Sequence, residues 1–514
     1  MSLDELNVEL EQRRAEALKM GGEEKLAARR KEGTLNARER IEQLIDPGSF
    51  WESGQLAASI RPEMRDRTPA DGKISGFGRV NGRELALVSN DFTVLGASSS
   101  TVNARKMQHI KETSEKRGLP IVFFGESTGA RMPDVMGASS IGSQRNPTQY
   151  LRRRSSPWIS AILGHCYGSA SWYACMSDIV VMRRGARMAV ASPRLSAMAT
   201  GEAVDEEELA GWRLHATASG LVDVVVDTDQ EALEVVRQLL SYLPSHVNEA
   251  PPTEDYKSDE QIEAEQRDRL GKLVPTNRTQ AYDMRKVVAC IFDQESVFEL
   301  KSMYGKSMVT AFARIEGQPV GVIANNPMFK GGAIDAEACT KVTSFIVLCD
   351  SYNIPIILLT DQPGFLIGLE GEKKAMPGRV MNWMNALSLC TVPRISIVAR
   401  KTYGQAVLNM GLGGNCDEAV AWTTGEIGFM DPNHGATIVY GVTEQDDPEE
   451  FQRARTEMAR DTSPFDAAAV FSVQEVIDPR DTRAYLKRAL RVHNLDSRAG
   501  VGEGHMRNWP TTVI

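Results

Sequence analysis

Two short turns, each placed directly after a predicted strand, carry the residues whose types and spacing point most clearly to chemistry. They are Gly168-Ser169-Ala170 and Gly404-Gln405-Ala406. Small residues at a strand-to-helix turn let a ligand approach the backbone, and the first N–H groups of the following helix point at that ligand. Such groups suit an oxygen that becomes negative during reaction, as when a thioester is converted to an enolate. The two turns therefore predict two sites that stabilise developing negative charge.

Two further pairs of glycine-centred turns recur along the chain. Residues 125–131, GESTGAR, correspond to residues 361–365, DQPGF, and Gly96-Ala97-Ser98 corresponds to Gly331-Gly332-Ala333. One such turn taken alone is explained as well by a tight bend, because glycine adopts backbone conformations that other residues avoid. Their paired occurrence at matched positions favours ligand sites over simple bends.

The elements that position these turns also occur twice. Residues 74–82, ISGFGRVNG, return as residues 309–317, VTAFARIEG, which begin 235 residues later. At the same displacement Asn90 corresponds to Asn325 and Lys106 to Lys341, and the displacement grows slowly towards the end of each copy. A repeat of this length lies far outside solenoid periods and indicates two copies of one domain.

Each copy alternates short β-rich runs with helical stretches, which is typical of an α/β domain. Examples in the first copy are the runs Leu85–Ser89 and Ile121–Phe124 and the helical stretch Val102–Arg117. We expect an N-terminal charged helical arm over residues 1–45 and a first domain over residues 46–250. Residues 251–277, rich in proline and charge, are expected to be a linker before a second domain over residues 278–514.

Composition excludes several classes of protein. A net charge of −9 over 514 residues argues against a general nucleic-acid binder or a binder of anionic membranes. Seven cysteines lie scattered without a CxxC pair, which predicts reduced thiols in the cytoplasm and neither disulfides nor a zinc site. The acidic, amphipathic first twenty residues resemble neither a secretory signal nor a transit peptide, and no apolar run approaches the length of a membrane span.

From about Gly33 to Asn494 the chain resembles the carboxyltransferase (β) subunits of biotin-dependent acyl-CoA carboxylases, the group that acts on propionyl-CoA, acetyl-CoA or methylcrotonyl-CoA. In that family both halves have the crotonase fold and the subunits assemble as a hexamer, a trimer of dimers. The motifs that carry the resemblance are Thr34–Phe50, Gly76–Arg83, Asn90–Val94, Ala104–Lys106, Ser127–Arg131, Phe312–Val320, Ala324–Met328, Asp361–Leu366, Thr391–Pro393, Arg400–Ala406 and Ile477–Thr482.

The resemblance implies a division of labour between the halves. Acyl-CoA would bind in the amino-terminal half, and carboxybiotin on a carrier protein would enter from the carboxy-terminal half of a neighbouring subunit. Carboxybiotin would release CO2, and the biotin left behind would take the acyl α-proton, so that the enolate attacks CO2. No biotin is expected on this chain, and biotin carboxylase and the carrier are expected as separate partners. No metal is expected in this subunit.

The resemblance also assigns site residues. The backbone around Gly168, Ser169 and Ala170 would hold the thioester oxygen, and that around Gly404, Gln405 and Ala406 would hold the ureido oxygen of biotin. The expected substrate-binding residues are Lys106, Gly129, Ala130, Arg131, Gly364, Phe365 and Leu408. The family usually has Gly-Gly-Ala at both turns, so Ser169 and Gln405 are departures, and Leu408 falls where the family influences acyl size.

Several alternatives stay open from the residues alone. Lys106 and Lys341 are both explained as ordinary helix-surface lysines. For Lys106 alone, a role in CoA binding is the alternative. Residues 152–154, RRR, suit either CoA phosphates or a solvated face. Glu126 would be a general acid only in a hydratase, and His215 is expected to be structural. A decarboxylase or transcarboxylase subunit, or a non-catalytic paralogue in a carboxylase assembly, are the competing functions.

Overall fold

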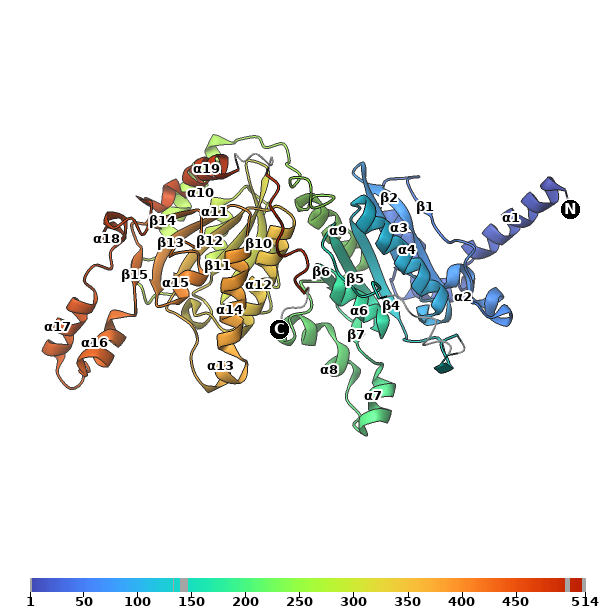
Figure 1. Cartoon of the computed structure of the whole chain (residues 1–514), viewed down its shortest axis with the longest axis horizontal. Coiled ribbons are helices and arrows are strands. Elements are labelled where there is room, and N and C mark those ends of the chain that lie inside the picture. Colours follow the sequence, from blue (N-terminus) through green and yellow to red (C-terminus); the bar gives the residue numbers. More distant parts are fainter. Residues whose placement is uncertain (1, 133, 139–146, 495–499, 511–514) are drawn as a thin grey trace. The chain divides into compact units, whose positions relative to one another are not determined.

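The sequence repeat corresponds to two structural units, each built on one eight-stranded sheet. The computed structural model describes residues 2–132, 134–138, 147–494 and 500–510. The first unit extends to Asn248 and the second begins at Glu249. In each unit helices cover both faces of the sheet (Figure 1). The predicted tandem of two α/β domains is confirmed.

The first unit contains the following elements. Its strands are β1 Trp51–Glu52, β2 Lys73–Val80, β3 Arg83–Asn90, β4 Ile121–Ser127, β5 Trp158–Tyr167, β6 Ile179–Arg183, β7 Arg187–Ala189 and β8 Val224–Val226. Its helices are α1 Leu3–Leu18, α2 Glu23–Lys31, α3 Ala37–Leu44, α4 Thr101–Arg117, α6 Ser169–Met176, α7 Pro193–Thr200, α8 Glu206–Ala210 and α9 Asp229–Tyr242.

The second unit repeats this succession. Its strands are β9 Phe298–Leu300, β10 Met308–Ile315, β11 Gln318–Asn325, β12 Ile356–Gln362, β13 Arg394–Tyr403, β14 Glu418–Trp422, β15 Glu426–Gly428 and β16 Glu475–Ile477. Its helices are α10 Glu260–Leu273, α11 Met284–Ile291, α12 Ala336–Ser351, α13 Leu369–Lys373, α14 Met376–Leu389, α15 Ala406–Asn409, α16 Pro432–Tyr440, α17 Pro448–Met458, α18 Pro464–Ala469 and α19 Thr482–His493.

The two sheets have the same topology. Their strand orders are β1-β2-β3-β4-β5-β6-β8 and β9-β10-β11-β12-β13-β14-β16, with β7 beside β5 and β15 beside β13. In each, an antiparallel hairpin feeds a run of parallel strands. Even the hairpin register repeats, because Lys73 faces Asn90 in the first unit and Met308 faces Asn325 in the second. The copies are therefore equivalent residue by residue in this part of the fold.

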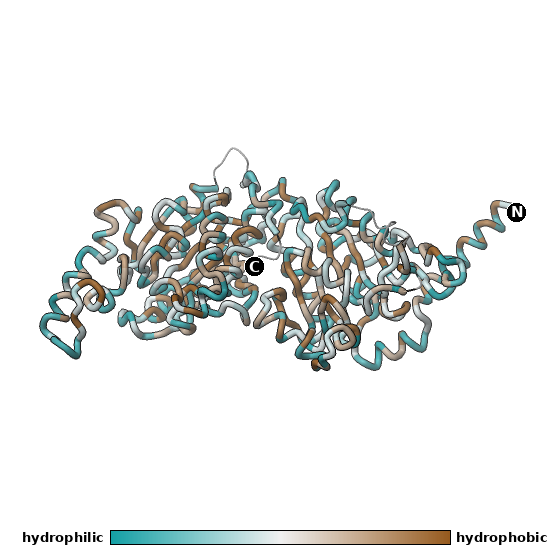
Figure 2. The backbone as a smooth tube through the Cα atoms, turned by 60° about the horizontal axis from the view of Figure 1, so that its bottom comes forward, coloured by the Kyte–Doolittle hydropathy of each residue, from teal (hydrophilic) through white to brown (hydrophobic). Residues whose placement is uncertain are grey.

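The central strands are buried over their whole length because helices cover both faces. Every residue of β4 and of β12 is buried, which explains their continuous apolar character. Helix α4 begins with a capping box formed by Ser100 and Asn103 and ends at Gly118, whose φ of 69° is left-handed. Figure 2 shows apolar stretches concentrated inside each unit. The capping pattern of the sequence therefore explains where α4 starts and ends.

Two segments differ from the simplest expectation. Residues 251–277, predicted as a linker, include helix α10, and its Leu270 is only 2% exposed within the apolar core of the second unit. Its charged residues occupy the outer face, so composition hides a helix that packs on α11. In the predicted arm, α1 buries only Ala17, whereas α3 packs on β3 and α9.

A buried carboxylate ends the second parallel strand of each sheet. In the first unit Glu126 receives Arg40 Nη1 at 2.6 Å and Arg29 Nη2 at 3.0 Å, and Arg40 also pairs with Asp229 at 3.2 Å. Although burial raises the pKa of Glu126, the two guanidinium groups hold it below its ordinary value. The arm therefore supplies the countercharge for the sheet.

In the second unit the buried carboxylate takes its countercharge from the neighbouring strand β13. Asp361, the equivalent of Glu126, receives Arg400 Nε at 3.0 Å and Lys401 Nζ at 3.1 Å, and Tyr282 donates its hydroxyl at 2.8 Å. The position equivalent to Arg400 in the first unit is Gly164, where an added Cβ would lie 2.0 Å from Glu126 Oε1. A side chain at position 164 would therefore collide with Glu126, and the first unit takes its arginines from the arm instead.

We predict that Arg40→Ala lowers the free energy of unfolding of the first unit by about 3–5 kcal/mol, because two buried carboxylates lose their shared partner. Urea denaturation monitored by circular dichroism measures the change. Because the pKa of Glu126 is lowered in the folded protein, the stability that Arg40 provides is fully present above the unfolded value of about 4.3. The difference in stability from wild type should therefore narrow as the pH falls below that value.

Arg13→Ala is the matched control, because Arg13 pairs with Glu9 on the exposed face of α1. It should leave the denaturation curve unchanged. Equal stability of the Arg40→Ala and Arg13→Ala proteins would contradict the role given to the arm.

Candidate active site

The turn at residues 168–170 joins β5 to helix α6. Gly168 has a φ of 66°, and its N–H donates to the carbonyl of Ala189 on β7 at 3.3 Å. Ser169 and Ala170 occupy the first two helical positions, where an N–H has no partner within the helix. In the described part of the chain no other acceptor bonds these two groups. They therefore remain available to a ligand.

The turn at residues 404–406 repeats this arrangement. Gly404 has a φ of 65°, and its N–H donates to the carbonyl of Gly428 on β15 at 3.1 Å. The N–H groups of Gln405 and Ala406 have no acceptor among the described residues. In both predicted triplets the glycine N–H thus completes the sheet, and two donors are left rather than three.

A second turn lies against the first one. Ser99 donates its N–H to the carbonyl of Gly129 at 2.8 Å and accepts the N–H of Arg131 at 2.8 Å. The N–H of Ala130 points away from this short bridge and has no acceptor in the described residues. A Cβ added to Gly168 would lie 3.6 Å from the Cα of Gly129, so the two turns are neighbours. Ala130 therefore offers a third donor beside Ser169 and Ala170.

The equivalent turn of the second unit has the same hydrogen bonds. Ile334 donates its N–H to Gly364 at 3.1 Å and accepts the N–H of Leu366 at 2.7 Å. Phe365 takes the place of Ala130, and Gly364 has a φ of 127° that favours glycine. The predicted residues Gly129 and Ala130 thus lie beside the predicted turn of the first unit, and Gly364 and Phe365 form the equivalent loop of the second unit.

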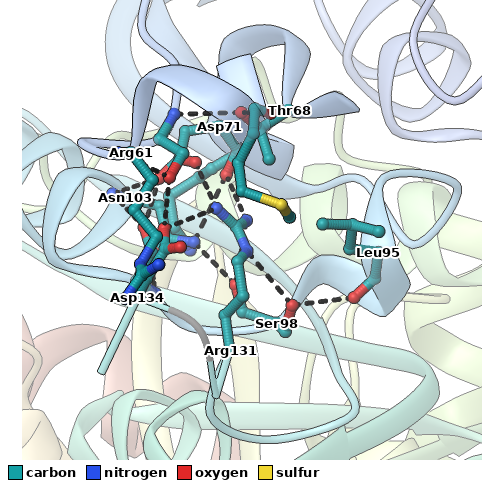
Figure 3. Close-up of polar contacts among 12 residues, drawn as sticks. Arg61, Thr68, Asp71, Leu95, Ser98, Asn103, Arg131 and Asp134 are labelled. Atoms are coloured by element: carbon teal, nitrogen blue, oxygen red, sulfur yellow. Dashed lines mark hydrogen bonds and ion pairs between the residues drawn. The ribbon is translucent and has the colours of Figure 1, made fainter. Parts of the chain in front are cut away.

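Arg131 has a different task from the one expected (Figure 3). Its side chain is 3% exposed and pairs with Asp71 and with Asp134, and Nη2 donates to the carbonyl of Ser98 at 3.3 Å. All of these partners belong to the loops beside the turn. Arg131 therefore holds the loop that carries Ala130, and its guanidinium is not directed at a substrate.

Neither Lys106 nor Lys341 is a surface lysine, and neither is available to CoA. Lys106 donates to the carbonyls of Gly54, Ala70 and Lys73, and Lys341 donates to those of Lys301, Tyr304 and Met308. Burial lowers the pKa of Lys106 to about 8 and that of Lys341 to about 7. Each amine ties three backbone carbonyls to its helix, one of them at the start of a strand, so the expected substrate contact of Lys106 is replaced by a structural one.

The other candidate residues from the sequence have the following surroundings. Leu408 lies partly exposed on α15 and covers Gly413, where an added Cβ would lie 2.5 Å from Leu408 Cδ2. Arg152 and Arg154 are buried and both pair with Asp178, which favours a structural reading of that charge run. The ring of His215 contacts the carbonyl of Met188 at 2.6 Å, as expected of a structural histidine.

Sequence reasoning missed the groups that fix the turns. Arg29 and Arg40 come from the arm, far from Glu126 in sequence, and Ser99 is brought to Gly129 by the fold. Asn90, one of the repeated positions, donates its side-chain amide to the Glu126 carbonyl at 2.6 Å. Its recurrence as Asn325 was a usable signal, because Asn325 bonds the backbone of the equivalent residue, although in the other direction: its Oδ1 accepts the N–H of Asp361 at 3.1 Å.

Among the described residues, no cluster of three or more histidine, cysteine, aspartate or glutamate side chains is placed to hold a metal ion. No helix in the same residues is long and apolar enough to cross a membrane.

Comparison with known proteins identifies similar chains. Residues 28–503 match the family model of the carboxyl transferase domain. The propionyl-CoA carboxylase carboxyltransferase subunit of Haloferax mediterranei is 34% identical over 508 residues, covering 96% of both chains. The methylmalonyl-CoA carboxyltransferase 12S subunit of Propionibacterium freudenreichii subsp. shermanii is 33% identical over 483 residues, covering 92% of this chain and 91% of that one. The crystal structure of transcarboxylase 12S, a hexamer with methylmalonyl-CoA bound, superposes with a TM-score of 0.86 at 31% identity, over 96% of each chain.

We predict that Lys106→Met lowers the free energy of unfolding by about 3 kcal/mol or more, because three buried carbonyls lose their donor. The KM for acyl-CoA of the folded protein should stay within about twofold of wild type. Lys341→Met is the matched variant, with the same bonds in the other unit, and should lose similar stability. A large rise in KM with unchanged stability, for Lys106→Met alone, would restore a CoA role.

Proposed function

The chain belongs to the carboxyl transferase domain family, and we propose that it works as the carboxyltransferase subunit of an acyl-CoA carboxylase. In that role it moves a carboxyl group from carboxybiotin on a separate carrier protein to the α-carbon, or the vinylogous position, of an acyl-CoA. The observation that carries this proposal is the matched pair of turns, each with two N–H groups that lack an acceptor among the described residues. Similarity to carboxyltransferase subunits over nearly the whole chain supports it.

The two sets of donors have separate tasks in this mechanism. In the first unit the N–H groups of Ser169 and Ala170, with Ala130 beside them, hold the thioester oxygen and stabilise it as the enolate forms. In the second unit those of Gln405 and Ala406 hold the ureido oxygen of biotin. The residues present fit that group, because Gly404 and Gly364 leave the backbone open to a ligand. A Cβ added to Gly404 would meet only the Phe429 carbonyl, at 3.4 Å, and a Cβ added to Gly364 would meet nothing within 4 Å.

No side chain of this protein has to act as the base. Carboxybiotin, when bound, supplies both the carboxyl group and, after its loss, the group that takes the acyl α-proton. The carboxylates that precede the loops of Ala130 and Phe365, those of Glu126 and Asp361, are buried in ion pairs, and the lowered pKa of Glu126 makes it a poor proton donor. The protein therefore contributes binding, orientation and backbone dipoles.

A transcarboxylase or decarboxylase subunit is the second candidate, because the same donors serve transfer in either direction. The similarity to a methylmalonyl-CoA carboxyltransferase subunit supports this second candidate. A non-catalytic paralogue is less well supported, since Ser169 and Gln405 retain N–H groups that a ligand can reach.

We also propose its partners and location. Biotin carboxylase and the biotin carboxyl carrier are separate chains, so streptavidin blotting of the purified protein should give no band. Buried thiols such as Cys166 and Cys339 support a reducing compartment, and we place the protein in the cytoplasm.

The direct test is carboxylation of a panel of acyl-CoA thioesters with biotin carboxylase, biotinylated carrier, ATP and bicarbonate supplied. We predict that Ser169→Pro and Gln405→Pro each lower kcat by about 10²–10³, because each removes one donor. Proline suits both sites: Ser169 is the first helical position, and Gln405 already has a φ of −65°.

Matched controls separate the N–H from the side chain. Ser169→Ala and Gln405→Ala lose the side-chain polar group but keep the N–H, so they should remain far more active than the proline variants. Circular dichroism and oligomer size report whether each variant folds. Proline variants that fold and keep wild-type turnover would exclude backbone donors as the basis of activity.

We further propose that the protein forms a homo-hexamer, a trimer of dimers, as transcarboxylase 12S does. Large apolar side chains in corresponding segments support burial by other subunits: Val190 and Met198 near α7, and Ile438 on α16, are each more than 70% exposed. Light scattering should give about six times 56.5 kDa. A stable, fully active monomer at micromolar concentration would refute this assembly.

A further inference from the structure

Two hydroxyl groups connect the neighbouring turns of the first unit. Ser99 Oγ lies 2.8 Å from Ser169 Oγ, and either oxygen can donate the hydrogen bond. Ser169 begins helix α6, whereas Ser99 belongs to the bridge that carries Ala130. The bond thus crosses from one set of backbone donors to the other.

The Ser99 end of this bond is firmly held. Both the N–H and the carbonyl of Ser99 are bonded, to Gly129 and to Arg131, at 2.8 Å each. Arg131 is itself buried in an ion pair with Asp71, and it donates to the carbonyl of Ser98 (Figure 3). Ser99 is therefore a fixed point on the loop that carries Ala130.

The Ser169 end is held by its own helix. The N–H of Ser169 shares a planar peptide unit with the carbonyl of Gly168, and this carbonyl accepts the N–H groups of Ser171 and Trp172 at 3.0 and 3.4 Å. These bonds fix the N–H of Ser169 relative to α6, but none of them reaches the loop that carries Ala130. The hydroxyl bond of Ser169 is thus placed to fix the distance between the two sets of donors.

The second unit has no such connection. Ile334 occupies the position of Ser99, and its apolar side chain is fully buried. Gln405, at the position of Ser169, is exposed. The hydroxyl pair is therefore a property of the first unit's site and is not required by the fold, which forms the same turn without it.

We propose that the Ser99–Ser169 hydroxyl pair is a positioning device, which sets the N–H of Ser169 and the N–H of Ala130 towards a single oxygen atom. This inference rests on the proposed function, because that oxygen is the one on which negative charge develops. Donors that are already oriented need no rearrangement as charge forms, so the pair acts on turnover more than on substrate binding. Ser99 and Ser169 are positioning residues through these hydroxyls.

A double-mutant cycle tests the proposal. Ser99→Ala and Ser169→Ala each break the same bond, so each should lower kcat about five- to tenfold, the effect of one neutral hydrogen bond, with KM for acyl-CoA unchanged within twofold. The double variant should be no slower than either single one. Ser99→Thr keeps the hydroxyl at a partly exposed position and should restore turnover.

Ser171→Ala is the matched control. Its hydroxyl, also on α6, donates to the Gly168 carbonyl at 2.8 Å and does not reach the neighbouring turn. In the variant that carbonyl still accepts the N–H groups of Ser171 and Trp172. The variant should retain wild-type kcat. Three results would each overturn the proposal. The first is an equal loss of kcat in Ser171→Ala, and the second is additive losses in the double variant. The third is a larger loss for Ser169→Ala with altered KM, because Ser169 would then contact the substrate directly.

A measurement without substrate keeps this inference separate from the proposed function. Hydrogen exchange of the amides of Gly168 and Arg131 should be faster in Ser99→Ala than in wild type or Ser99→Thr. If wild type transfers no carboxyl group to any acyl-CoA while exchange changes as stated, the proposed function fails and the link between the turns stands. Unchanged exchange together with unchanged turnover in the Ser99→Ala protein would refute the link itself.

Discussion

A buried negative charge at the end of the second parallel strand is the constraint around which each unit is organised. Glu126 and Asp361 occupy equivalent positions, directly before the turns that carry Ala130 and Phe365. An ionised carboxylate in such a place destabilises the fold unless cations and hydrogen-bond donors surround it. The arginines that do so also fix the end of the strand, so the backbone groups that follow it have a defined direction.

The same backbone solution then serves in both units. A glycine with positive φ follows β5 and β13 and donates its N–H to the short neighbouring strand. The next two N–H groups of each turn have no acceptor among the described residues. Side chains at Ser169 and Gln405 differ without changing these donors. Duplication of one domain thus provides two similar pairs of backbone donors, on which the proposed function rests.

Sequence alone predicted the duplicated α/β fold and the glycine turns, because periodic apolar runs and glycines report local backbone requirements. It failed where the outcome depends on which atoms meet across the fold. Lys106 was predicted to contact CoA, but three carbonyls from segments distant in the sequence surround its amine. Likewise, neither the ion pair of Arg131 with Asp71 nor the strand bond of Gly168 has a local sequence pattern. Helix α10 was hidden because a single buried leucine holds a mostly charged segment.

The different origins of the two countercharges have a consequence for the order in which the chain is synthesised. Arg29 and Arg40 leave the ribosome well before Glu126, so the acid of the first unit always emerges after its partners. In the second unit Asp361 emerges before Arg400 and Lys401, and only Tyr282 precedes it. During translation Asp361 on β12 can therefore be paired with Arg400 and Lys401 only after β13 has been synthesised. Glu126 on β4, in contrast, emerges when Arg29 and Arg40 are already present.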